Sequence, residues 1–157
     1  MTVDNSDKLN EVFCEVLEKL AFMFAEPASN SALPSEVEKS VEASMSFTGA
    51  MQGKCLLMVP EALCPEIAAN ILGLDSDDEL ATLRAQDALK ELLNVTCGRI
   101  LTALAGTEPV FDLTAPVIME GGAEEWKALL DRGRAVGFLV DDCPVLLELS
   151  IAGSQKN

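Results

Sequence analysis

The chain has 157 residues, 49% of them hydrophobic, and this predicts one soluble domain over 1–157 with an ordinary buried core. Its formal net charge of −15 argues against nucleic acid and anionic membranes as partners, because both are bound through Lys and Arg side chains. The five cysteines form no CxxC pair and histidine is absent, which argues against a disulfide framework, a zinc site and Ser-His-Asp or Cys-His catalysis.

The beginning of the chain is polar and acidic over residues 1–7, unlike a secretory signal or an Arg-rich transit peptide. No apolar run approaches the roughly 18 residues that span a bilayer. We therefore expect a cytoplasmic protein without membrane insertion. Apolar residues next recur every three or four positions and predict an amphipathic helix at 5–25, followed by a loop rich in Pro and Ser at 26–36.

Strand and helix patterns alternate through the rest of the chain. In chain order, they predict strands at 37–48 and 53–59, a helix at 61–71, a loop at 74–78, a long helix at 78–105, an extended segment at 109–119, a short helix at 123–131, strands at 135–141 and 145–151, and a frayed tail at 153–157. Residues 49–53 and 141–144 are predicted as hairpin turns, and Asp77 or Asp78 as the N-cap of the long helix. Trp126, on the short helix, is expected to be a core anchor.

The order of these elements predicts an α+β fold with a mainly antiparallel sheet and long amphipathic helices packed on one or both of its faces. A helix, a loop and a strand hairpin occur in each half of the chain. This order suggests pseudo-duplicated halves, although no exact sequence repeat accompanies it.

The long helix has two distinct faces when its residues are placed about 100° apart. The side expected to pack into the core carries Leu89, Leu93, Thr96, Ile100 and Leu104. The opposite side carries Asp87, Glu91 and Asn94, with Gly98 one turn further on. The polar residues should therefore stand on the surface.

This polar face has two interpretations. Asn94 has both a donor and an acceptor and can hold a water molecule in a fixed orientation. The exposed Glu91 carboxylate, one turn away, can reach into another protein's active site together with it. Gly98 would let a partner's backbone approach closely. The alternative is an ordinary solvated helix face, which spacing alone does not distinguish from a site.

The segment Asp87-Ala-Leu-Lys-Glu91-Leu-Leu-Asn94, with Pro116 placed 22 positions after Asn94, closely resembles the signature of the CheC/CheX/FliY chemotaxis phosphatases. The signature is an Asp or Ser, a Glu four positions later, an Asn three after that, and a distant Pro. The layout of helices and hairpins also resembles this family over nearly the whole chain.

The resemblance implies that the protein dephosphorylates a CheY-like response regulator that carries a phospho-aspartate. Asn94 would orient the attacking water, and Glu91 would anchor the complex through a lysine of the regulator. Asp87 would support the helix surface or touch the partner, and Pro116 would shape the neighbouring backbone. No cofactor or metal is expected on this chain, because Mg²⁺ would be held by the partner.

The first helix reproduces part of this spacing in Asp7, Glu11 and Cys14, with a thiol where the carboxamide should be and Glu36 at the position of the distant Pro. It is either a decayed second site or simply the polar side of that helix. One intact motif resembles the CheX-like branch, which implies a homodimer. Two other functions stay open: a non-catalytic module that binds a regulator or flagellar component, and a structural or dimerisation domain.

Overall fold

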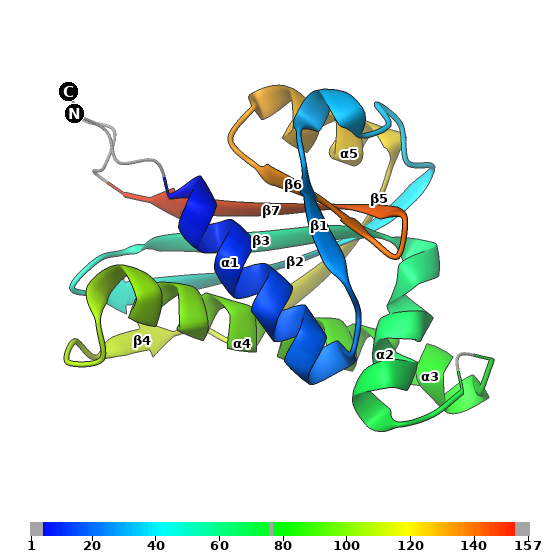
Figure 1. The fold of residues 1–157 in the computed structure, drawn as a ribbon, viewed down its shortest axis with the longest axis horizontal. Helices are drawn as coiled ribbons and strands as arrows, with labels where there is room; N and C mark the ends of the chain where they lie inside the picture. Colours follow the sequence, from blue (N-terminus) through cyan, green and yellow to red (C-terminus); the bar gives the residue numbers. More distant parts are fainter. Residues whose placement is uncertain (1–4, 76, 153–157) are drawn as a thin grey trace.

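The computed structural model describes residues 5–75 and 77–152, so the predicted tail at 153–157 lies outside the described residues. Seven strands form one sheet in the order β1-β6-β7-β3-β2-β4, with β5 also paired to β2 (Figure 1). Every strand pair in it is antiparallel, which confirms the predicted α+β class. The predicted duplication of the two halves stays a prediction.

The strands are β1 (Ala25–Ala28), β2 (Lys39–Gly49), β3 (Gly53–Pro60), β4 (Phe111–Leu113), β5 (Val117–Gly122), β6 (Val136–Val140) and β7 (Cys143–Ile151). The helices are α1 (Ser6–Val16), α2 (Cys64–Leu72), α3 (Glu79–Leu83), α4 (Ala85–Ala105) and α5 (Ala123–Arg132). Three short helical turns are η1 (Leu17–Ala21), η2 (Asn30–Ala32) and η3 (Glu61–Leu63).

Both predicted hairpins are confirmed. β2 pairs with β3, and β6 pairs with β7. Val140 lies opposite Cys143, so the second turn has only two central residues, Asp141 and Asp142, with φ of 48° and 69°. Positive φ at both positions matches the twist of the flanking strands in a two-residue hairpin. β7 therefore begins two residues before the predicted start at 145.

The predicted helix at 5–25 is too long. The helical segment ends at Ala21, because Phe22 adopts a left-handed conformation with φ of 54°. Ala25 then begins a strand, β1, which pairs with β6, so the loop predicted at 26–36 is also partly wrong. The helix is predicted to continue because the apolar residues run on past Ala21 without a Gly. Pairing with β6 makes residues 25–28 a strand instead.

The predicted helix at 78–105 is divided in two. Asp78 is the N-cap of α3, as predicted, and its Oδ1 accepts a hydrogen bond from the backbone N–H of Leu80 at 2.9 Å. The axis breaks at Arg84, which has φ of −101° and ψ of 9°, and α4 follows. Neither Gly nor Pro marks this break in the sequence. Ala81 packs with the small side chains of α2, and this contact holds the short helix α3 in place.

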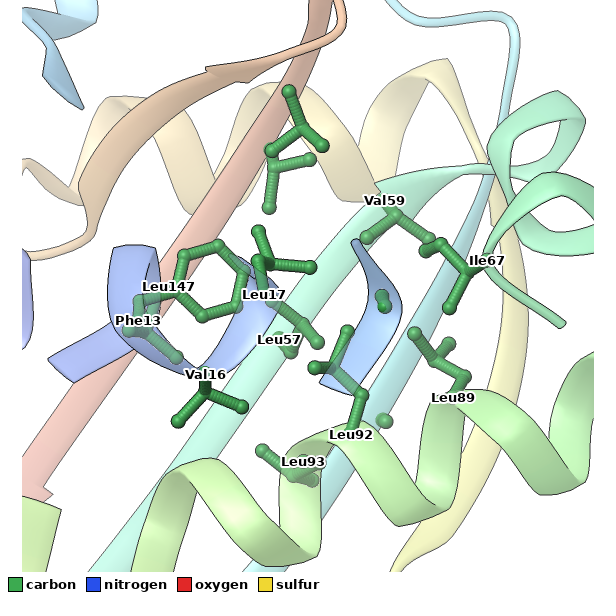
Figure 2. Packing of buried hydrophobic residues seen from close by; sticks show 14 of the residues in the cluster. Phe13, Val16, Leu17, Leu57, Val59, Ile67, Leu89, Leu92, Leu93 and Leu147 are labelled. Carbon is green, nitrogen blue, oxygen red and sulfur yellow. The ribbon is translucent and has the colours of Figure 1, made fainter. Parts of the chain in front are cut away.

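The main core lies between the sheet and the helices α1, α2 and α4 (Figure 2). Residues of β3 alternate between the two sides of the sheet, as the two-residue period of a strand requires. Leu57 and Val59 belong to the main core, whereas Met58 belongs to a second cluster under α5. The helices thus cover both faces of the sheet, and α4 is held against one of them.

Trp126 is the centre of the second cluster. It is fully buried beside Leu129 of its own helix and Leu146 of β7. Its indole Nε1 donates a hydrogen bond to the carbonyl oxygen of Pro34 at 3.0 Å. The prediction that Trp126 anchors the core is confirmed.

Candidate functional site

The helix α4 presents the three predicted polar side chains on its outer face. Asp87, Glu91 and Asn94 are all exposed. The opposite face is fixed by packing, since Leu89, Leu93 and Ile100 are completely buried. Figure 2 shows Leu89 and Leu93 within the cluster formed with α1 and the sheet. The two-faced helix predicted from the sequence is therefore confirmed, and its polar face is held on a rigid support.

Gly98 is partly exposed and lies one turn beyond Asn94 on the same helix. A Cβ atom added at this position would meet no atom within 4 Å. Packing inside the protein therefore does not require a glycine here. Glycine is unfavourable in the interior of a helix, and nothing inside the protein explains it here. Its effect is an open backbone surface beside Asn94.

The helix α1 runs beside α4 and forms a second wall next to this face, which the sequence did not predict. A hollow of about 220 Å³ between the two helices is lined by Val95 and Arg99 of α4, among others, and extends along α1. The acidic side chains that line it and the adjoining hollow are Glu11 and Glu15 of α1 and Glu18 of η1. The helical spacing of these three glutamates is the sequence signal that could have predicted an acidic wall here.

An ion pair lies on this second wall. Lys19 Nζ lies 2.9 Å from Glu15 Oε2, one turn apart on the exposed side of the helical segment. This hydrogen bond lowers the pKa of the Glu15 carboxyl below its usual value, and the positive charges of Lys19 and Arg99 act in the same direction. Because Glu11 and Glu18 add two more carboxylates, this wall carries more acidic than basic side chains, like the face of α4.

The partial motif on α1 differs from that of α4 in the direction of its third residue. Asp7 and Glu11 are exposed, but Cys14 is half-buried, and its Sγ donates to the carbonyl oxygen of Ala25 at 3.4 Å. Burial raises the pKa of this thiol. Cys14 thus contacts strand β1, whereas Asn94 faces outward.

Pro116 lies immediately before β5, between two segments that pair with β2. It is not on the polar face of α4, but the strand that follows it packs against that helix. Gln86 Nε2 of α4 donates to Glu120 Oε2 of β5 at 3.2 Å and connects the two elements. The structure therefore brings the segment after Pro116 next to the start of the site helix.

All five cysteines lie among the described residues and are free. Two of them, Cys55 of β3 and Cys97 of α4, are completely buried and face each other beneath the site. The hydrogen bond between these thiols raises the pKa of Cys55. They help to pack α4 on the sheet as small apolar side chains.

In the part of the chain that the structure describes, no group of three or more Cys, Asp or Glu side chains is placed to hold a metal ion. Within the same residues, no helix is both long and apolar enough to cross a bilayer. The candidate site is the exposed face of α4, with a carboxylate and a carboxamide one turn apart.

An antiparallel sheet with this order, and a long helix packed against it, make up the fold of CheX and CheC-like proteins. The sequence profile described as chemotaxis phosphatase CheX matches residues 41–136, which include the whole of α4 and Pro116. The chain belongs to the CheX family.

Solved structures agree with this assignment. The chain is similar to CheX from Desulfovibrio desulfuricans, with 15% identity, a TM-score of 0.69, and 95% of this chain and 99% of that chain covered. CheX from Vibrio vulnificus gives 19% identity, a TM-score of 0.68 and coverages of 95% and 97%. CheX in a complex with CheY, BeF3 and Mg²⁺ from Borrelia burgdorferi gives 18%, 0.64, and 95% and 98%. No curated protein matches the sequence.

Proposed function

We propose that this protein accelerates hydrolysis of the phospho-aspartate of a CheY-like response regulator. The observation that carries the proposal is the exposed Asp87, Glu91 and Asn94 face of α4 in a chain of the chemotaxis phosphatase family. The complex of the Borrelia burgdorferi relative with CheY, BeF3 and Mg²⁺ supports a regulator as the partner.

Asn94 is the catalytic residue in this proposal. Its carboxamide can accept a hydrogen bond from a water molecule and donate another to a phosphoryl oxygen, which fixes the water for in-line attack. Phosphoryl transfer depends mainly on positioning and electrostatics, so one orienting group can have a large effect on rate. The regulator supplies the phospho-aspartate and the Mg²⁺, and this chain supplies the positioned carboxamide.

Glu91 anchors the complex, because its exposed carboxylate can pair with a lysine of the regulator. Asp87 and Gly98 extend the contact by one turn in each direction along the exposed side of α4. Pro116 shapes the backbone that leads into β5, next to the start of α4. The packing of Leu89 and Leu93 limits movement of the helix, which favours a fixed approach of Asn94.

We also propose that the protein acts in the cytoplasm as a homodimer. Val117 and Met119 are large apolar side chains of β5 with 57% and 60% of their surface exposed, next to β2 at one side of the sheet. Exposed apolar groups of this kind are typical of interfaces. Light scattering should give twice the mass of the chain, and a monomer at micromolar concentration would contradict the dimer.

The competing function is a module that binds the regulator without catalysis, through the same face. Purified protein and phosphorylated regulator are mixed, and loss of the phosphoryl group is followed for the wild type, Asn94→Ala and Glu91→Ala. We expect Asn94→Ala to remove most of the acceleration while regulator binding survives, and Glu91→Ala to weaken binding.

Lys127→Ala is the matched control, because Lys127 is exposed on α5 and forms a local ion pair, with Asp131 at 3.0 Å. It should dephosphorylate the regulator as fast as the wild type. Equal decay rates for the wild type and Asn94→Ala would leave only the binding module. Absence of regulator binding would leave a structural role.

A further inference from the structure

A second hollow lies on the sheet face opposite the candidate site, where α5 covers only part of the strands. It has a volume of about 460 Å³ and is bounded by α5 and by β2, β3 and β7. Its floor contains Leu56 and Met58, which point to the α5 side of the sheet. A volume of this size fits a small organic molecule with an apolar body.

Three of the 11 Lys and Arg residues of this acidic chain line this one hollow: Lys54, Arg132 and Arg134. Arg132 Nη2 pairs with Glu148 Oε1 at 2.8 Å. Among the described residues, Lys54 and Arg134 have no carboxylate oxygen within 4.0 Å. Two positive side chains at the hollow are therefore available to a ligand.

The hollow also contains carboxylates that are not fully paired. Glu148 is only 5% exposed, and its Oε2 has no hydrogen-bond partner among the described residues. Glu42, on β2, lines the same hollow and has no Lys or Arg within 4.0 Å in the part of the chain described. Glu125 is different, because its carboxylate accepts the backbone N–H of Gly122 at 2.7 Å and caps α5.

A buried carboxylate oxygen without a partner is costly, because it has lost water and gained no hydrogen bond. An ammonium group next to Glu42 and Glu148 would supply the missing partner once the buried Glu148 carboxylate turns toward the hollow, while Lys54 and Arg134 would take an anionic group by charge-assisted hydrogen bonds. The carbon skeleton between the two groups would lie on Leu56 and Met58. Two free cations and two incompletely paired carboxylates around an apolar floor thus match a molecule that carries charges of both signs.

We propose that this hollow is a binding site for a small zwitterion, with an ammonium group and a carboxylate or phosphate on a short skeleton. The site is separate from the phosphatase face, since α4 packs on the other side of the sheet. A carboxylate and a phosphate share the required chemistry, and the two are separated by the choice of probe.

The test uses the full-length chain labelled with ¹⁵N and four probes. L-leucine carries ammonium and carboxylate, O-phosphoethanolamine carries ammonium and phosphate, N-acetyl-L-leucine lacks the ammonium group, and leucinol lacks the anionic group. We expect saturable shifts of the amide signals of Leu56 and Glu148 with L-leucine or O-phosphoethanolamine, and no shift at Asn94. The one that binds more tightly is the preferred zwitterion.

N-acetyl-L-leucine and leucinol should each have a Kd at least about tenfold higher than that of the preferred zwitterion. Lys54→Ala and Arg134→Ala change exposed residues and should weaken binding similarly, whereas Lys127→Ala should leave it unchanged. The proposal is overturned if neither zwitterion gives saturable shifts at millimolar concentration. It is equally overturned if a one-charge probe binds as tightly, or if both Ala variants at the hollow bind like the wild type.

Discussion

Replacing Gly98 by Ala should stabilise the protein and weaken its action on the regulator. The residue lies inside α4, and a Cβ there would meet no atom within 4 Å, so the methyl group causes no clash in the free protein. Ala is favoured over Gly in a helix interior by about 0.8–1.0 kcal/mol. For a domain of this size, that gain should raise Tm by about 2–4 °C.

The same methyl group should oppose docking if the regulator's backbone approaches α4 at this point. Extra methyl groups forced into a packed contact destabilise it by about 1–3 kcal/mol. Since about 1.4 kcal/mol corresponds to a factor of ten, regulator binding should weaken by roughly five- to 150-fold. Stability and activity are thus predicted to change in opposite directions.

Two assays test this prediction on the same preparation: thermal unfolding followed by circular dichroism, and regulator dephosphorylation at several protein concentrations. Ala103→Gly, an exposed change near the end of α4, is the control, and it should lower Tm without altering regulator binding. If Gly98→Ala raises Tm yet dephosphorylates the regulator like the wild type, the regulator does not approach Gly98, and the proposed docking face is wrong.

Two further changes test the fold. Trp126→Phe removes the indole N–H donated to the Pro34 carbonyl and leaves unfilled space, so the free energy of unfolding should fall by about 1–3 kcal/mol; an unchanged urea midpoint would contradict this. Burial, and then the negative Asp141, raise the pKa of Glu66 above its usual value of 4.5. The folded protein therefore binds this proton more tightly than the unfolded chain, and its stability falls as the pH rises from 4.5 through the raised pKa. Glu66→Gln should therefore be more stable than the wild type at pH 7, by a few tenths of a kcal/mol for this partly exposed group, with no gain below about pH 4, as urea titrations at both pH values would show.

Local signals in the sequence were sufficient for the hairpins and for the two faces of α4. The turn between β2 and β3 has glycines at both ends, and alternating residues in β3 have opposite environments. Leu89, Leu93 and Ile100 repeat at helical spacing, so the exposed direction of Asn94 could be predicted without the fold. The signature spacing with Pro116 added the family.

Other features depend on contacts between distant residues and could not be predicted. Nothing local distinguishes Ala25 from the helix before it, because β1 exists only through its pairing with β6. The break at Arg84 reflects packing of Ala81 on α2 and has no Gly or Pro signal. For the same reason, the position of α1 beside the site helix, and the hollow on the opposite face, required the folded chain.

The pairing of β3 with β7 has a consequence for the order of events during synthesis. These two central strands come from opposite parts of the chain, with Gly53 opposite Ile151. Contacts this distant in sequence form slowly, because a long loop must close, at a cost in entropy, before the contacts stabilise the chain. A nascent chain can form α4 early, but the apolar side of that helix has no complete sheet to cover until the ribosome has released β7. The Asn94 face of α4 therefore gains its full support only after β7 has emerged from the ribosome, and a chain cut before β7 should be a target for proteolysis.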